Sequence, residues 1–169
     1  MSETIHQPIT DFELPNVAIG PDPFKLSSYA EDPEIRALVL LFQRDYHCPK
    51  CRGQVQEIAS RYDEFRERGA RVVSILPESE ERARNWQSHY DLPYPLLADE
   101  SKTTGEQYDQ PTRFGALGSL HDMVGRMPEA VVVDATRDPP VIDYVHQGTM
   151  PADRPTVDDL LERVSELTA

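Results

Sequence analysis

The strongest hydrophobic pattern in the chain joins a short apolar run to a long amphipathic segment. The run Leu38–Phe42 is continuous, which is typical of a strand buried on both faces. After it, apolar residues recur at steps of four and three, and this period predicts one buried stripe on a helix that ends at Gly69. The stripe consists of Cys51, Val55, Ile58, Tyr62 and Phe65.

Other segments predict the remaining elements. A short strand is expected within 9–15, and further strands over 71–76, 95–98, 130–134 and 141–146. Helical segments are expected near 26–29, from 79 to about 90, over 101–108 and from 156 to 167. Residues 1–10 form a loosely anchored lead-in, and 109–127 an irregular stretch rich in proline and glycine. Parallel strands linked by helices, followed by a hairpin, predict one α/β domain over 1–169 with a mixed central sheet flanked by helices.

Two cysteines stand where the buried strand gives way to the helix. Pro49 suits the first helical position, so Cys48 is expected at the N-cap. The helix N-terminus, with Lys50 and Arg52 nearby, favours a thiolate over a thiol. We therefore predict Cys48 as an exposed nucleophile of low pKa and Cys51, on the apolar stripe, as the buried resolving thiol.

Metal binding and inert packing are the alternatives for this cysteine pair. Structural zinc takes four ligands, whereas the chain has two cysteines and no His-x-x-x-His pattern. A pair spaced this way at a helix start can close a disulfide and exchange it with other thiols. Redox chemistry is the favoured interpretation, and we predict no metal site.

The charge of the chain narrows the classes of partner. It carries 30 acidic and 17 basic residues, for a formal net charge of −13. Nucleic acid and anionic membrane surfaces are therefore not expected partners. This acidity is typical of a protein in a high-salt cytoplasm, with an ordinary acidic protein as the alternative. The first residues lack the pattern of a signal peptide, so we expect a reducing, cytoplasmic location, where paired cysteines favour catalysis.

In the order of its elements and in several motifs the chain resembles the thioredoxin fold. The resemblance is to the redoxin branch, which includes peroxiredoxins and the extended thiol–disulfide reductases. The motifs that carry it are Asp11–Pro15, Leu40–Phe42, Cys48–Cys51, Val72–Ile75, Tyr94–Asp99, Pro128–Asp134 and Gly148. It implies a thioredoxin-like sheet with an N-terminal extension.

The resemblance also implies roles for particular residues. Pro128 matches a proline that these families hold in the cis form against the cysteines, and the backbone beside it, at Met127, pairs with substrate. Glu78 matches an acidic residue near the cysteines in the reductases, where it would move the proton that Cys51 loses. The peroxidase motif is incomplete, because Leu41 and Asp45 stand where typical peroxiredoxins have proline and threonine or serine.

Two residues just before the cysteines are further candidates. Arg44 could hold an incoming peroxide or tune the thiolate, with an exposed ion pair to Asp45 as the alternative. His47 could assist proton transfer, or be a loop histidine without such a role.

These expectations lead to one main interpretation of function and two alternatives. The chain is expected to be a thiol–disulfide oxidoreductase that cycles between a dithiol and a Cys48–Cys51 disulfide. The alternatives are a thiol peroxidase, with Cys48 attacking hydroperoxide and Cys51 resolving, and a non-catalytic redoxin module. We expect no bound cofactor. The expected partners are a protein or small-molecule disulfide, or a hydroperoxide, together with a thiol electron donor.

Overall fold

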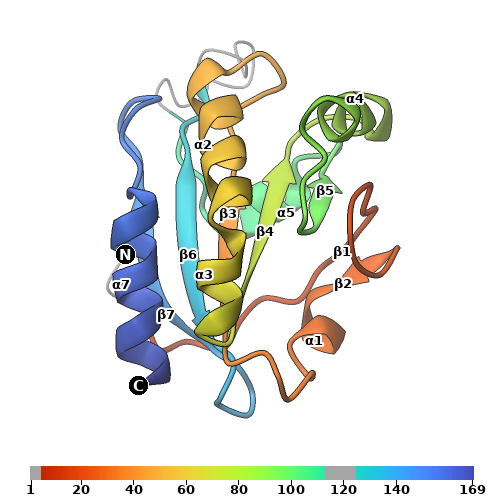
Figure 1. Ribbon diagram of the computed structural model, residues 1–169. Helices are drawn as coiled ribbons and strands as arrows, with labels where there is room; N and C mark the ends of the chain where they lie inside the picture. The colour runs from red at the N-terminus through yellow and green to blue at the C-terminus, as the bar shows by residue number, and fades with distance from the viewer. Residues whose placement is uncertain (1–4, 113–124) are drawn as a thin grey trace.

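A mixed β-sheet forms the centre of the protein, in a computed structural model that describes residues 5–112 and 125–169 (Figure 1). Within these residues five strands pair in the order β5 (Leu96–Ala98), β4 (Ala70–Leu76), β3 (Ala37–Phe42), β6 (Glu129–Asp134) and β7 (Val141–Gln147). β3, β4 and β5 are parallel, whereas β6 and β7 are antiparallel to their neighbours. The predicted α/β class and mixed sheet are confirmed.

Four helices contribute side chains to a core on one face of the sheet. They are α2 (Pro49–Ser60), α3 (Tyr62–Glu67), α4 (Glu80–Tyr90) and α7 (Val157–Thr168). In Figure 1, α2 and α3 lie in front of the central strands, and α7 lies in front of β7 and to the left of β6. Every residue of the predicted apolar stripe is buried against this face, which confirms the period.

The stripe does not lie on one unbroken helix. Arg61 leaves the helical conformation with φ −119° and ψ 17°, so α2 ends at Ser60 and α3 begins at Tyr62. Its side chain forms ion pairs with Glu64 and with Asp158 of α7. The buried stripe survives the break because Tyr62 keeps its place on the apolar face. Gly69, with φ +73°, follows the end of α3, where glycine tolerates the left-handed conformation.

The N-terminal part of the chain covers the opposite face of the sheet. β1 (Glu13–Leu14) pairs with β2 (Phe24–Lys25), and α1 (Leu26–Tyr29) follows at once. The predicted strand within 9–15 is therefore shorter than expected. α5 (Thr103–Gln107) is followed by Tyr108, which joins the second core cluster. That cluster includes Phe12, Phe24, Leu26, Leu38, Leu40, Phe42 and Val131.

The lead-in predicted over residues 1–10 is tied to β7 where the structure describes it. The His6 N–H donates to the Ile142 carbonyl (2.6 Å), and the Ile142 N–H donates to Gln7 (2.9 Å). Ile9 donates to Pro140 (3.1 Å). Of the irregular stretch predicted over 109–127, residues 113–124 lie outside the described residues. Within the described chain, no helix is long and apolar enough to cross a bilayer.

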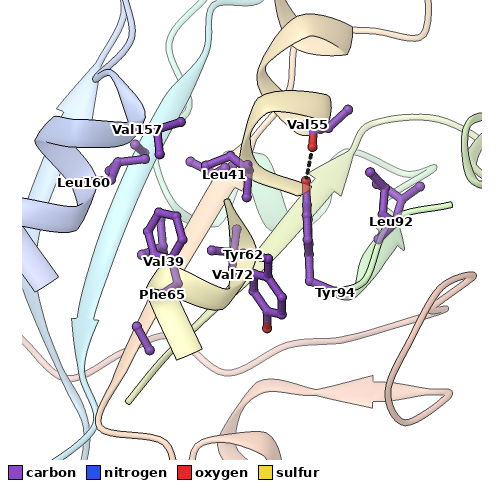
Figure 2. Close-up of a cluster of buried hydrophobic side chains, with 14 of the residues drawn as sticks. Val39, Leu41, Val55, Tyr62, Phe65, Val72, Leu92, Tyr94, Val157 and Leu160 are labelled. Carbon is purple, nitrogen blue, oxygen red and sulfur yellow. Dashed lines mark hydrogen bonds between the residues drawn. The ribbon is translucent and has the colours of Figure 1, made fainter. Parts of the chain in front are cut away.

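Tyr94 links the helical layer to the sheet (Figure 2). It is fully buried, and its hydroxyl donates to the Val55 carbonyl of α2 (3.2 Å) while lying 3.5 Å from the Ser74 hydroxyl of β4. This bond anchors α2 four residues after Cys51. Desolvation raises the pKa of the phenol, so the hydroxyl stays protonated and donates.

Tyr94→Phe is expected to lower the free energy of unfolding by about 1 kcal/mol, because it removes this hydrogen bond and keeps the ring. Urea denaturation measures the change. Tyr29→Phe is the matched control, since the Tyr29 hydroxyl makes no hydrogen bond within the described chain. Its effect should stay within about 0.5 kcal/mol. Equal effects of the two substitutions would contradict the role given to the Tyr94 hydroxyl.

Candidate active site

Cys48 caps α2, as the sequence predicts. Its backbone is extended (φ −62°, ψ 111°), Pro49 occupies the first helical position, and the Cys48 Sγ accepts the N–H of Cys51 (3.1 Å). A disulfide joins Cys48 to Cys51, whose Cα atoms lie 5.3 Å apart. Both sulfurs therefore lie in the first turn of α2, where backbone N–H groups and the helix dipole stabilise negative charge.

The exposure of Cys48 differs from the expectation. In this disulfide form Cys48 is 2% exposed and Cys51 is 0% exposed, and both join the core cluster under α2. In this form the disulfide holds the Cys48 sulfur against Cys51, which lies on the buried face of the helix. The surface is nevertheless close, because His47, Pro49 and Lys50 are exposed.

The loop between β3 and α2 is held by side chains distant in sequence. The Tyr46 N–H donates to Glu78 Oε2 (2.9 Å). The Tyr46 carbonyl accepts from Trp86 Nε1 (3.0 Å) and from Arg52 Nε (2.9 Å). Trp86 is fully buried, and its indole fixes the loop as well as filling the core. These bonds set the direction in which the chain enters the cysteine turn.

Glu78 is one of the residues that hold this loop, and within the described chain it makes no hydrogen bond to either sulfur. Its second carboxylate oxygen accepts from Arg82 (3.2 Å), so both oxygens are engaged away from the disulfide. Within the described residues no hydrogen bond joins Glu78 to Cys51, so the proton-carrier role gains no support from these contacts and stays a prediction. The chain turns sharply after β4, where the Glu78 N–H bonds to the Leu76 carbonyl (2.8 Å), and the side chain reaches Tyr46.

The charged side chain that contacts Cys51 is Arg154. Its Nη2 lies 3.4 Å from the Cys51 Sγ, and the backbone N–H of Arg44 donates to the same sulfur (3.3 Å). Sequence reasoning missed Arg154, because it lies in the loop before α7, 103 residues from Cys51. No local pattern marks it. Burial, with the positive charge of Arg44, lowers the pKa of the Arg154 guanidinium to about 10, so it remains charged at neutral pH.

Arg44 and His47, the two further candidates just before the cysteines, have different surroundings. Arg44 Nε donates to the Arg126 carbonyl (2.7 Å), and its Nη1 lies 3.7 Å from the buried carboxylate of Asp45. The pair is therefore largely buried rather than the exposed ion pair considered as an alternative. Asp45 also accepts the His47 N–H (2.8 Å). The His47 side chain is exposed and lies edge-on to the Tyr46 ring.

Pro128 departs from the role that the resemblance implies. The cis peptide bonds of the described chain precede Pro23 and Pro139, so the Met127–Pro128 bond is trans and the cis prediction is wrong. Buried Met127 is bonded within the protein: its N–H donates to Pro111 (2.9 Å), and its carbonyl accepts from Gln110 Nε2 (3.0 Å). Its N–H is thus occupied. These bonds hold the chain in position just before β6 begins at Glu129.

Buried polar groups continue from Met127 along the start of β6. Gln110 Nε2 also donates to the Gln43 carbonyl (2.9 Å), and its Oε1 accepts from Arg126 (3.2 Å). Glu129 is 3% exposed and accepts from Gln147 (3.0 Å), while its second oxygen and Arg126 Nε have no hydrogen-bond partner among the described residues. Burial raises the pKa of Glu129 to about 8, so the carboxyl is mostly protonated at neutral pH.

A groove of about 480 Å³ runs between α2 and the loop before α7. Polar side chains of Lys50, Gln54 and Arg154 line it together with the apolar Ile58, Val157 and Leu160. Arg154 therefore touches both the groove and the Cys51 sulfur. Elsewhere in the described residues, as here, no three His, Cys, Asp or Glu side chains are grouped to hold a metal ion.

Comparison with known proteins gives consistent matches. Residues 5–138 match the AhpC/TSA family. Chloroplastic peroxiredoxin Q of Sedum lineare is 30% identical over 96 residues, which are 56% of this chain and 50% of that protein. Its counterpart in Arabidopsis thaliana is 32% identical over 80 residues, 47% of this chain and 37% of that protein. The matches thus span half or less of the length of these curated relatives.

Solved structures match over nearly the whole chain. Peroxidoxin BcpB from Mycobacterium tuberculosis has a TM-score of 0.77 at 22% identity, covering 98% of this chain and 99% of that one. The reduced 2-Cys peroxiredoxin of Plasmodium vivax has a TM-score of 0.78 at 14% identity, covering 97% and 96%. At such identities the likeness concerns the fold, and it confirms the predicted thioredoxin-like architecture.

Glu129→Gln is expected to change how stability depends on pH. Because the folded pKa of Glu129 is near 8, above the unfolded value of about 4.3, the folded state binds the proton more tightly. The contribution of Glu129 to stability is therefore fully present below about pH 4.3 and should fall by up to a few kcal/mol as pH rises through 8 toward 9. The amide cannot ionise and should flatten this fall. Denaturation curves at pH 5 and pH 9 measure the effect, and parallel pH profiles would contradict it.

Glu78→Ala is expected to lower the free energy of unfolding by about 2 kcal/mol, because it leaves the Tyr46 N–H without its charged acceptor. Glu78→Gln keeps an acceptor oxygen and should cost less than half of that. Neither substitution should move the pH dependence of disulfide formation, measured by thiol titration after rapid oxidation. A slower, pH-shifted reaction in Glu78→Gln would support the proton-carrier role instead.

Proposed function

The chain belongs to the AhpC/TSA family, and we propose that it is a thiol peroxidase that cycles between a dithiol and the Cys48–Cys51 disulfide. The observation that carries the proposal is that disulfide, placed in the first turn of α2 with both sulfurs in contact with N–H donors. Thiolates are the reactive form of cysteine, and such donors stabilise them.

The catalytic cycle follows from this geometry. The Cys48 thiolate attacks one oxygen of a hydroperoxide and the O–O bond breaks, which gives a Cys48 sulfenic acid and an alkoxide. The alkoxide becomes an alcohol after taking a proton from solvent. The Cys51 thiolate then attacks the Cys48 sulfur, and the S–O bond breaks to release hydroxide, which becomes water after taking a proton. Two electrons and two protons from an external dithiol, or from two thiols, restore the starting state.

Pro128 and Met127 favour hydroperoxide over a protein disulfide as the oxidant. Extended thiol–disulfide reductases, on the resemblance above, use a cis proline and its neighbouring backbone to hold a substrate strand. Here the Met127–Pro128 bond is trans, and the Met127 N–H is bonded to Pro111. A hydroperoxide needs no such strand pairing and could approach beside the exposed Pro49 and Lys50.

Disulfide exchange is the second candidate, and the Cys-Pro-x-Cys spacing favours it. Two cysteines separated by a single helical turn form a small ring that opens and closes with little backbone movement. In that case a mixed disulfide on Cys48 replaces the sulfenic acid as the intermediate. The electron balance at the cysteine pair is the same in both reactions.

Cys51→Ser should separate the two candidates. Treated with one equivalent of hydrogen peroxide or cumene hydroperoxide, the reduced variant is expected to accumulate a sulfenic acid on Cys48, because no thiol is placed to resolve it. A dimedone adduct located by mass spectrometry measures this. Cys48→Ser is the matched control and should give no rapid adduct.

Steady-state assays on one preparation complete the test. Peroxide consumption with a dithiol reductant should exceed the reduction of insulin disulfides by at least about tenfold in catalytic efficiency, equivalent to about 1.4 kcal/mol. The reverse order would favour the exchange enzyme. Absence of both reactions would leave a non-catalytic redoxin module.

A further inference from the structure

Arg154 has an unusual set of partners for a half-buried guanidinium. Its Nη1 donates to Gln54 Oε1 (2.9 Å) and to Gln43 Oε1 (3.3 Å), and its Nε donates to the Pro151 carbonyl (3.0 Å). Each of these acceptors is neutral. The remaining contact is the Cys51 sulfur, 3.4 Å from Nη2.

No carboxylate balances this charge within the described residues. The ion pairs there use other cationic side chains, and the charge that perturbs Arg154 is the positive charge of Arg44. Buried charges are normally paired, because desolvation costs several kcal/mol per ion. Among residues 5–112 and 125–169, Arg154 thus has no anionic partner in the oxidised protein, where the Cys51 sulfur is neutral.

Reduction supplies the missing anion. When the Cys48–Cys51 bond opens, Cys51 becomes a group that can ionise next to this guanidinium. Other charged groups lie in the same region of the site. Arg44 is paired with Asp45, and Lys50 and Glu57 border the groove beside Arg154. Arg154 is a cationic side chain in direct contact with this sulfur, and a positive charge there favours a thiolate over a thiol.

We propose that Arg154 holds Cys51 as a thiolate in the reduced protein, and that this positioning residue replaces a general base in the resolving step. This rests on the proposed function, in which Cys51 resolves Cys48. The thiolate attacks the Cys48 sulfur directly, so no proton has to leave Cys51 during the reaction. In the reductive half-cycle an external thiolate attacks Cys48, and Cys51 departs with the electron pair into the field of the same guanidinium.

Gln43 and Gln54 are essential to this arrangement. Both amide oxygens accept from Nη1, and Gln43 Nε2 also donates to Gln54 Oε1 (3.2 Å). The two amides fix the guanidinium without neutralising it. A carboxylate at either position would form an ion pair with Arg154 and weaken its effect on Cys51.

The experiment titrates Cys51 in the full-length reduced protein. In a Cys48→Ser background, the ultraviolet absorbance of the thiolate is followed against pH, which does not depend on access of a reagent to the buried sulfur. We expect a Cys51 pKa below the ordinary value of about 8.5. Arg154→Gln should raise it by at least about one unit, and in the otherwise wild-type protein should slow disulfide formation about tenfold at neutral pH. Arg154→Lys should recover part of the shift.

The control is Arg84→Gln, which removes the same charge from an exposed position on α4 and should leave the Cys51 titration unchanged. Gln54→Met keeps the volume of the side chain while loosening the guanidinium, and should raise the Cys51 pKa by a smaller amount even if Arg154→Gln fails to fold. Identical titration curves for parent, Gln54→Met and Arg154→Lys, with a Cys51 pKa near or above 8.5, would overturn the proposal.

The titration uses no hydroperoxide, so its outcome is independent of turnover. A shifted Cys51 pKa in a protein without peroxide turnover would contradict the proposed function and leave the role of Arg154 standing. Rapid turnover with an unshifted Cys51 pKa would do the opposite.

Discussion

The packing of α2 against β3 fixes the Cys51 sulfur, and the rest of the site is arranged around that sulfur. Cys51 occupies the first position of the apolar stripe that continues through Val55 and Ile58, all fully buried. The same burial that stabilises the helix therefore places a reactive atom at the edge of the core. Cys48, one turn earlier, reaches the same point as the N-cap.

The position of Cys48, unlike that of Cys51, depends on polar contacts of the loop that precedes it. The loop before Cys48 carries backbone groups that must be satisfied when they are covered, and α4 and the residues before it supply the partners. Arg52 adds to this, since its guanidinium lies over the rings of Tyr46 (4.8 Å) and Trp86 (5.5 Å). Glu78 and Trp86 thus act on the chemistry indirectly, by holding the turn from which Cys48 projects.

Periodicity was sufficient to predict most of the elements, since each depends on neighbours in sequence. The strand before Cys48, the stripe from Cys51 to Phe65, and the capping box of α7 at Thr156 and Asp159 are local patterns of this kind. The break between α2 and α3 at Arg61 was not predicted, because the apolar stripe continues across it. The ion pair of Arg61 with Asp158 also joins helices far apart in sequence, which no local pattern shows.

The chemical surroundings of the site were much less predictable. Arg154 contacts Cys51 only because the loop before α7 folds back over α2, and no spacing in the sequence encodes that contact. The resemblance placed Glu78 near the cysteines and Pro128 in the cis form, yet each is governed by contacts of this chain: Tyr46 for Glu78, and the bonds of Met127 to Pro111 and Gln110 for Pro128. Side-chain roles transfer poorly when the partners of those side chains differ.

The negative charge of the whole chain disfavours a thiolate at Cys51, whereas the cationic side chain beside the sulfur favours it. Which effect is larger depends on the distance of each charge from the sulfur. A surface carboxylate about 15 Å from Cys51 would disfavour the anion by only about 0.05 kcal/mol at physiological salt, because water and ions screen it. Thirteen net charges at that distance would sum to less than about 1 kcal/mol. A guanidinium 3.4 Å away, at a protein-like effective dielectric, contributes about 5 kcal/mol before desolvation is subtracted. The surface can therefore be strongly acidic, as a crowded or salty solution requires for solubility, without determining the ionisation of the cysteines.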